Sequence, residues 1–177
     1  MPYLGNLEQL VFFKWEIKLS NTKIEATYSL YARAIDEKRY ELLKKVFHPE
    51  AQLQYIVGSQ EFACSGSEST TYFRNFLNLC FWTSHLIGSP AIELDGKKAF
   101  STARVQAVHQ QVLDDGSISR WILRGSYHDH LELFQDTWLI TKRYCHTPDE
   151  EGEFLTTGVK IFEEIGWTSK DKISFNR

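Results

Sequence analysis

The feature that most constrains this chain is a long stretch in its second half, from Thr83 to His146, in which apolar and polar residues alternate. Three short turn signals interrupt it, at Asp95-Gly96, Asp115-Gly116 and Gln135-Asp136. Successive side chains of a strand point to opposite faces of a sheet, so a period of two is typical of strands with one buried face. The stretch therefore predicts four antiparallel strands in a meander.

The first half of the chain predicts helices instead. Thr22 and Glu25 match a capping box, and apolar residues recur at helical spacing behind them, which predicts a helix over 22–36. The His48-Pro49 pair is expected to end the next helix, because proline disfavours a helical residue before it. The other predicted elements are, in chain order, that short helix over 40–47, a strand over 53–57 and a third helix over 72–80.

Helices first and a meander second indicate an α+β fold, since the apolar face of the sheet has to be covered by the helices. We predict a cone-shaped α+β barrel in which N-terminal helices pack on a curved antiparallel sheet and leave a pocket. A chain of 177 residues fits one domain, 1–177. Its core is expected over about 20–147, and the tail over 148–177 is expected to be a lid or a surface helix.

Composition narrows the kinds of partner. A net charge of -3 and a pI near 6.1 give no sign of a basic surface that would bind phosphate groups. We therefore expect neither nucleic acid nor membrane as a partner. The expected partner is a small hydrophobic molecule. Cys64, Cys80 and Cys145 lack the paired spacing of a zinc site, which is typical of a reducing compartment and predicts a cytoplasmic protein.

Segment 7–19 is rich in large apolar residues and predicts a helix that packs on the domain or on a neighbouring subunit. The exposed face of a curled sheet commonly binds a partner as well. We therefore expect a homodimer or a homotrimer.

Five local strings, in this order, resemble the nuclear transport factor 2-like superfamily and, within it, the SnoaL-like enzymes and scytalone dehydratase. They are YARAID at 31–36, LLKKVFHPEA at 42–51, SHLIG at 84–88, LDGKKA at 94–99 and GSYHD at 125–129. The resemblance covers roughly residues 24–146. It rests on the order and spacing of the strings, because each string alone is weak.

The resemblance implies a catalytic pair, Asp36 at the end of the first long helix and His85 on the strand after Thr83. A carboxylate that receives one ring N–H fixes the imidazole tautomer and leaves the other nitrogen to take or give a proton near neutral pH. Without the resemblance, an aspartate behind a helix is more typical of a cap, and a strand histidine of a half-exposed surface group.

The same resemblance implies substrate contacts from Tyr55 and His109. His109 shares a strand face with Ala103, Val105 and Ala107, whose small apolar side chains indicate an inward face.

His128 and His130 match the positions of a ligand-orienting pair, although the family has serine and asparagine there. The opposite face of that strand is more apolar and is an alternative inward face, with Tyr127 and Asp129 as the alternative pocket pair. Two histidines at 128 and 130 also suit a metal ion, but this motif is loose, so we expect no metal and, from the resemblance, no cofactor.

Together these observations predict a cofactor-independent lyase or isomerase, a dehydratase or cyclase of secondary metabolism. Its substrate would be a small apolar compound such as a polyketide, terpenoid or steroid-like metabolite. Two alternatives stay open. One is the structural β subunit of a ring-hydroxylating dioxygenase, and the other is a small-molecule-binding module without catalysis.

Overall fold

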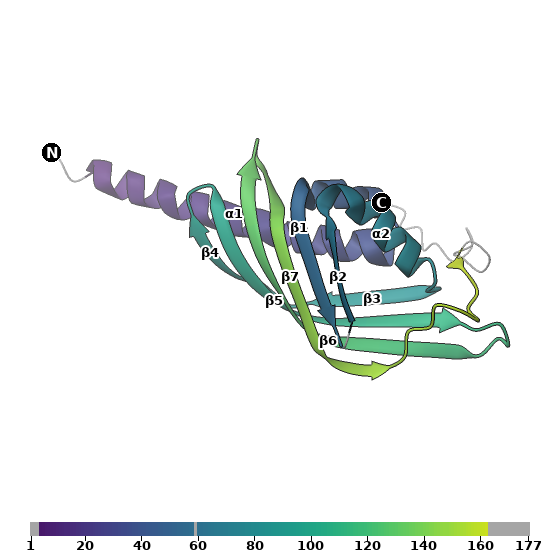
Figure 1. Cartoon of the computed structure of the whole chain (residues 1–177). Coiled ribbons are helices and arrows are strands. Elements are labelled where there is room, and N and C mark those ends of the chain that lie inside the picture. The colour runs from purple at the N-terminus through teal and green to yellow at the C-terminus, as the bar shows by residue number, and fades with distance from the viewer. Residues whose placement is uncertain (1–3, 59, 163–177) are drawn as a thin grey trace, which may run out of the picture.

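The computed structural model describes residues 4–58 and 60–162 of the chain, with side chains described from residue 14 onward. Two α-helices and one 3-10 helix lie on the concave side of a strongly curved sheet (Figure 1). The helical elements are α1 (Leu4–Asp36), η1 (Tyr40–Lys45) and α2 (Gly66–Leu77).

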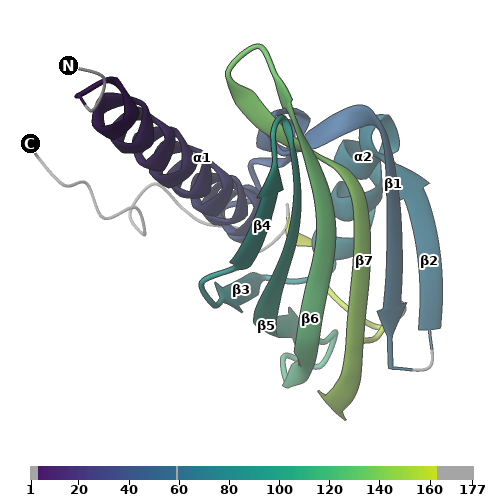
Figure 2. The same ribbon diagram turned by 90° about the vertical axis from the view of Figure 1, so that its left-hand side faces the viewer.

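The sheet has seven strands in the order β2-β1-β7-β6-β5-β3, with β4 also paired to β5 (Figure 2). The strands at the two ends of this order, β2 and β3, are not hydrogen-bonded to each other, so the sheet is curved but unclosed. The strands are β1 (Phe47–Val57), β2 (Gln60–Ser65), β3 (Trp82–Ile87), β4 (Ala91–Asp95), β5 (Lys98–Val112), β6 (Ile118–Phe134) and β7 (Thr137–Gly152).

The α+β fold predicted from the sequence is confirmed, with two corrections to the sheet. The sheet is mixed rather than antiparallel throughout, because β1 runs parallel to β7. The region predicted to hold four strands holds five, because Gly88, Ser89 and Pro90 separate β3 from β4. Proline has no N–H to give to a ladder, which favours a break there.

The first helix is longer than predicted and has no cap at Thr22. α1 runs unbroken through that position, and the Thr22 hydroxyl donates to the carbonyl of Lys18 (3.0 Å), one turn earlier. The capping-box prediction at Thr22 is therefore wrong. The predicted apolar stripe is confirmed, since Ile24, Tyr31 and Ile35 are fully buried.

A capping box does occur, at the start of α2. The Ser65 hydroxyl accepts from the Glu68 backbone N–H, and the Glu68 carboxylate accepts from the Ser65 backbone N–H. This arrangement satisfies two of the donors that a helix start leaves unpaired. Two further corrections concern this region: β1 begins at Phe47 and includes Pro49, and β2 was not predicted.

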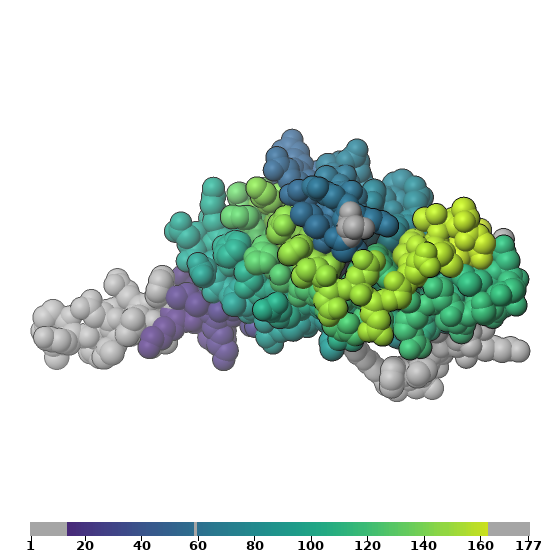
Figure 3. Space-filling model, turned by 60° about the horizontal axis from the view of Figure 1, so that its bottom comes forward, coloured from purple at the N-terminus to yellow at the C-terminus, as the bar shows by residue number. Residues whose placement is uncertain are grey.

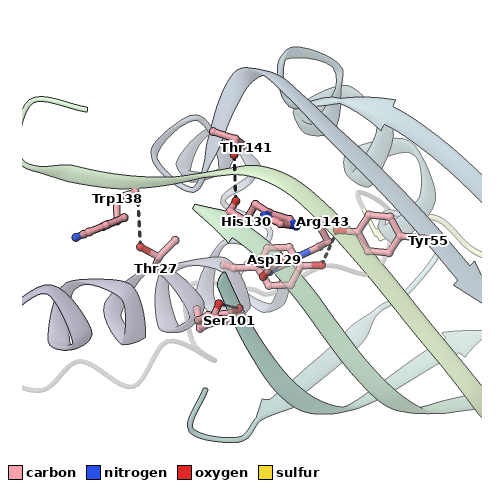
Figure 4. Close-up of polar contacts among 10 residues, drawn as sticks. Thr27, Tyr55, Ser101, Asp129, His130, Trp138, Thr141 and Arg143 are labelled. Carbon is pink, nitrogen blue, oxygen red and sulfur yellow. Dashed lines mark hydrogen bonds and ion pairs between the residues drawn. The ribbon is translucent and has the colours of Figure 1, made fainter. Parts of the chain in front are cut away.

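An ion pair lies inside the core, between α1 and the sheet. Arg143 of β7 donates to both carboxylate oxygens of Asp129 of β6, at 2.9 and 2.7 Å, and neither side chain is exposed (Figure 4). The guanidinium carbon lies 4.1 Å from the ring centre of Tyr127 and 4.4 Å from that of Tyr31. Paired charge and aromatic faces together compensate for the loss of water.

The described part of the tail packs along the end of β5 and β6 (Figure 3). The side-chain amide of Gln111 donates to the Leu155 carbonyl and accepts from the Leu155 N–H, each at 2.8 Å. Phe154 stacks on Phe76 of α2 with ring centres 4.1 Å apart. The predicted helix or lid beyond residue 162 lies outside the described residues. Among the residues described, no helix has the length and apolar character needed to span a bilayer.

Candidate active site

Asp36 and His85 are in direct contact. The Nδ1 atom of His85 lies 2.8 Å from Oδ1 of Asp36, and the backbone N–H of His85 donates to Oδ2 at 2.8 Å. The Thr83 hydroxyl donates to Oδ1 at 3.1 Å. The predicted contact between the two side chains is present.

Local structure explains this placement. Asp36 is the last residue of α1, whose buried stripe fixes the helix end against β3. Thr83 and His85 lie two residues apart on β3, so their side chains share the face that meets this helix end. The His85 side chain is only 7% exposed, whereas that of Asp36 is 25% exposed.

The environment keeps Asp36 ionised. Burial alone would raise its pKa, but the hydrogen bonds and charge of His85 and the Thr83 hydroxyl together lower the pKa below its ordinary value. An ionised carboxylate only accepts hydrogen bonds, so Nδ1 of His85 carries the proton between the two side chains. In the neutral form of the ring, Nε2 of His85 then holds the lone pair.

His85 lines a cavity between the sheet and the helices. The cavity has a volume of about 50 Å³ and is partly open to solvent. Ligand pockets commonly have a mainly apolar lining with few polar groups, as this cavity does. Its polar side chains are His85, His109, Tyr31, Tyr55, Tyr127 and Thr147, and the rest are mainly aromatic and aliphatic, including Phe62, Phe73, Phe76, Trp121, Leu77, Leu123, Val57 and Val105.

Two tyrosine hydroxyls meet in the cavity wall. The hydroxyl oxygens of Tyr31 and Tyr55 lie 3.5 Å apart, and the Tyr127 ring makes an edge contact with Tyr31. Burial raises the pKa of all three tyrosines, so the hydroxyls stay protonated near neutral pH. Two hydroxyls that share one hydrogen bond retain one proton to donate, and a ligand oxygen in the cavity can accept it.

His109 lies beside His85, with ring centres 5.5 Å apart and planes at 88°. It is 3% exposed, and its Nδ1 atom has no hydrogen-bond partner among the described residues. Burial, followed by the nearby His85, lowers the pKa of His109 to about 3. The ring is therefore neutral near neutral pH, which leaves it able to bind a ligand by hydrogen bonding but without an extra proton to give.

The predicted pair His128 and His130 is not at the cavity. Both lie on the outer face of β6, where Nε2 of His128 contacts the Ser126 hydroxyl at 3.0 Å and His130 packs against Phe100. The inward face is the alternative one, with Trp121 and Tyr127 buried. Placing the two histidines among the ligand contacts was therefore incorrect.

Two further residues on the inward side of the fold, Asp129 and Tyr31, could be predicted from the sequence only in part. Asp129 is inward as the alternative required, but it binds Arg143 rather than lining the cavity. Tyr31 was expected on the apolar stripe of the helix, which predicts burial but not contact with a ligand. The metal motif lacks support in the described residues, which contain no group of three or more potential ligands.

The chain thus combines an α+β fold with a contact between Asp36 and His85 at the wall of an apolar cavity. The chain belongs to the family defined by the SnoaL-like domain, whose sequence profile matches residues 19–144. This confirms the resemblance found in the sequence, and the nuclear transport factor 2-like fold is confirmed as well. No curated protein matches the chain.

Solved structures share the fold at low sequence identity. A candidate scytalone dehydratase from Novosphingobium aromaticivorans has a TM-score of 0.66 at 19% identity, covering 77% of this chain and 89% of its own. A type 2 hexachlorocyclohexane dehydrochlorinase has a TM-score of 0.66 at 15% identity, covering 82% and 99%. The β subunit of a candidate aromatic-ring-hydroxylating dioxygenase from Novosphingobium aromaticivorans has a TM-score of 0.61 at 17% identity, covering 75% and 92%.

Proposed function

We propose that the protein is a cofactor-independent lyase or isomerase that acts on a small, mostly apolar molecule by acid-base proton transfer. The observation that carries the proposal is the contact between Asp36 and His85 at the wall of an apolar cavity. The similarity to a candidate dehydratase and a dehydrochlorinase supports it, because both names describe elimination reactions.

In the proposed reaction, Nε2 of His85 removes a proton from a carbon next to a carbonyl or a leaving group. The electron pair of the C–H bond forms a new double bond, and negative charge moves to the carbonyl oxygen or leaves with the departing group. The proton on His85 is then returned, to the departing group in an elimination or to another carbon in an isomerisation. Asp36 orients the ring and stabilises the imidazolium.

The tyrosine hydroxyls stabilise the negative charge that develops when the proton is removed. Tyr55, with Tyr31 beside it, donates to the oxygen on which negative charge develops, and this preorganised donor stabilises the transition state. Tyr127 and neutral His109 complete the polar contacts to the substrate. A substrate with one or two oxygens on an apolar skeleton, such as a polyketide, terpenoid or steroid-like secondary metabolite, matches this lining.

The experiment that tests the proposal follows proton exchange rather than one product. Candidate ketones and β-substituted ketones are incubated with the protein in deuterated water, and loss of the acidic C–H signal is followed by NMR. We expect exchange or elimination with wild type, and a loss of about 100-fold or more in His85→Ala. The matched control is His128→Ala on the outer face, which should retain the rate. Equal rates in wild type and His85→Ala would exclude the mechanism.

One observation favours a second candidate function, the structural β subunit of a dioxygenase. The first half of α1 projects from the domain (Figure 1), and Trp15 and Leu19 on it are 63% and 44% exposed. This candidate predicts copurification with a larger iron-sulfur subunit when the two are expressed together. A homodimer or homotrimer without such a subunit, which we propose as the native state, would favour the enzyme.

A further inference from the structure

We propose that Thr83 is a positioning residue of this site, which holds the Asp36 carboxylate in the orientation that His85 requires. The inference rests on the proposed function for its catalytic consequence, but the positioning itself is a property of the protein without substrate. It adds to the pair a residue that the sequence resemblance does not point to.

The hydrogen bonds of the carboxylate give the first argument. Within the described residues, Oδ2 of Asp36 accepts only from the backbone N–H of His85, whereas Oδ1 accepts from both the Thr83 hydroxyl and the His85 ring. Donors on both oxygens oppose rotation of the carboxylate about its terminal bond. Apart from His85, Thr83 is the only described residue whose side chain donates a hydrogen bond to Asp36.

Burial gives the second argument. Thr83 is 3% exposed, and a buried hydroxyl needs a partner for its single proton. In the part of the chain that the structure describes, its one side-chain hydrogen bond is the one to Asp36. The hydroxyl is therefore committed to the carboxylate and unavailable to a ligand, and Thr83 is not among the residues that line the cavity.

The sheet register gives the third argument. Thr83 lies directly opposite His109 on β5, and His85 lies opposite Ala107. Residues directly opposite on neighbouring strands share a face of the sheet. Thr83 thus stands between the carboxylate and the second cavity histidine, where a valine would fill the same space without holding Asp36.

The test compares Thr83→Val, which removes the hydroxyl at nearly constant shape, with Thr83→Ser, which keeps it. In the substrate-free protein, ¹³C NMR of the Asp36 carboxyl and ¹⁵N NMR of the His85 ring report on the contact directly. We expect the Asp36 titration to move to higher pH in Thr83→Val, with an altered His85 Nδ1–H signal. Thr83→Ser should resemble wild type.

With a substrate found by the exchange assay, kcat should fall about tenfold in Thr83→Val, the equivalent of one hydrogen bond to a charged group, with KM unchanged. Thr70→Val is the matched control, because it removes another buried hydroxyl, bonded to the Tyr40 carbonyl, outside the site. It should leave both NMR signals as in wild type.

The outcomes separate the two proposals. Wild-type NMR signals in a folded Thr83→Val protein would overturn the positioning role, whatever the activity. Absence of turnover in wild type would instead count against the proposed reaction and leave the NMR comparison intact. If Thr83→Val does not fold, Thr83→Ala and Thr83→Cys replace it, and unchanged signals in the folded variant would equally overturn the inference.

Discussion

His85 and His109 face each other from neighbouring antiparallel strands, with ring centres 5.5 Å apart, yet their chemical states differ. Nδ1 of His85 is bonded to a carboxylate, whereas Nδ1 of His109 has no hydrogen-bond partner in the described part of the chain. Burial holds His109 neutral, because its pKa is lowered to about 3. Of two imidazoles side by side, one is therefore bonded to a carboxylate and the other is held neutral by burial.

The first prediction is that His109 makes the stability of the folded protein depend on pH in the acid range. The folded protein resists protonation of this ring down to about pH 3, whereas the unfolded chain binds the proton near its ordinary pKa of 6.5. Because the unfolded state binds more protons in this window, stability falls as pH drops from 6.5 toward 3, by on the order of 5 kcal/mol in full. His109→Gln should lose this dependence.

Urea unfolding at a series of pH values measures the effect, with His128→Gln on the outer face as the control. The control should keep the wild-type slope between about pH 6 and pH 4. A wild-type slope in His109→Gln would show that another group is responsible.

The second prediction concerns Asp36, whose pKa is also lowered in the fold but by hydrogen bonds and charge rather than by burial. Its pKa is lower in the fold than the ordinary value of 3.8, so its ionised form stabilises the protein above that value and the contribution is lost as pH falls through the folded pKa. Asp36→Asn should cost about 2 kcal/mol near neutral pH and progressively less in strong acid. Chemical denaturation near pH 7 and near pH 3 distinguishes this from a loss that is equal at both.

The third prediction concerns the buried ion pair. Asp129→Asn leaves the Arg143 guanidinium without its counter-charge in the core, and we expect a loss of about 3–5 kcal/mol. The double variant Asp129→Leu, Arg143→Met removes both charges and should recover most of that loss. Denaturant midpoints of the three proteins provide the measurement. A double variant less stable than Asp129→Asn would mean that the pair itself, not the unpaired charge, sets the cost.

The fourth prediction concerns the tail segment beside the cavity. Phe154 stacks on Phe76 and also contacts Trp121, which lines the cavity. Because it is half-buried, Phe154→Ala should cost about 1–2 kcal/mol, less than a fully buried phenylalanine. The Phe154→Ala variant should also bind an apolar fluorescent probe more strongly than wild type, because loss of the ring opens the aromatic end of the cavity. Ile118→Ala, at a mostly exposed position, is the control and should change neither measurement.

Much of the fold could be predicted because local pattern and tertiary packing agree. The alternation along β5 and β6 reports directly which residues lie on the same face, and the stripe of Ile24, Tyr31 and Ile35 reports the buried side of α1. Alternation alone leaves the choice between the two faces open. The inward face of β6 is the one with Trp121, Tyr127 and Leu131, because large apolar side chains gain most from burial.

The contact between Asp36 and His85 could be anticipated only from the resemblance, since 49 residues separate them and no local pattern relates them. Arg143 was not predicted at all, because an arginine in an alternating strand normally marks the solvent face. Only the partner Asp129 on β6 and the aromatic faces of Tyr31 and Tyr127 make its burial favourable, and these contacts arise from sheet register and helix packing.

The length of α1 has a consequence for the architecture of the protein. The buried part of the helix begins at Ile24, well after the exposed positions around Trp15, and the carboxylate sits at its opposite end. One part of this continuous helix therefore packs on the domain, and another part projects from it. A shortened protein that starts at about residue 20 should therefore retain the contact between Asp36 and His85, because the exposed positions around Trp15 lie toward the other end of the helix.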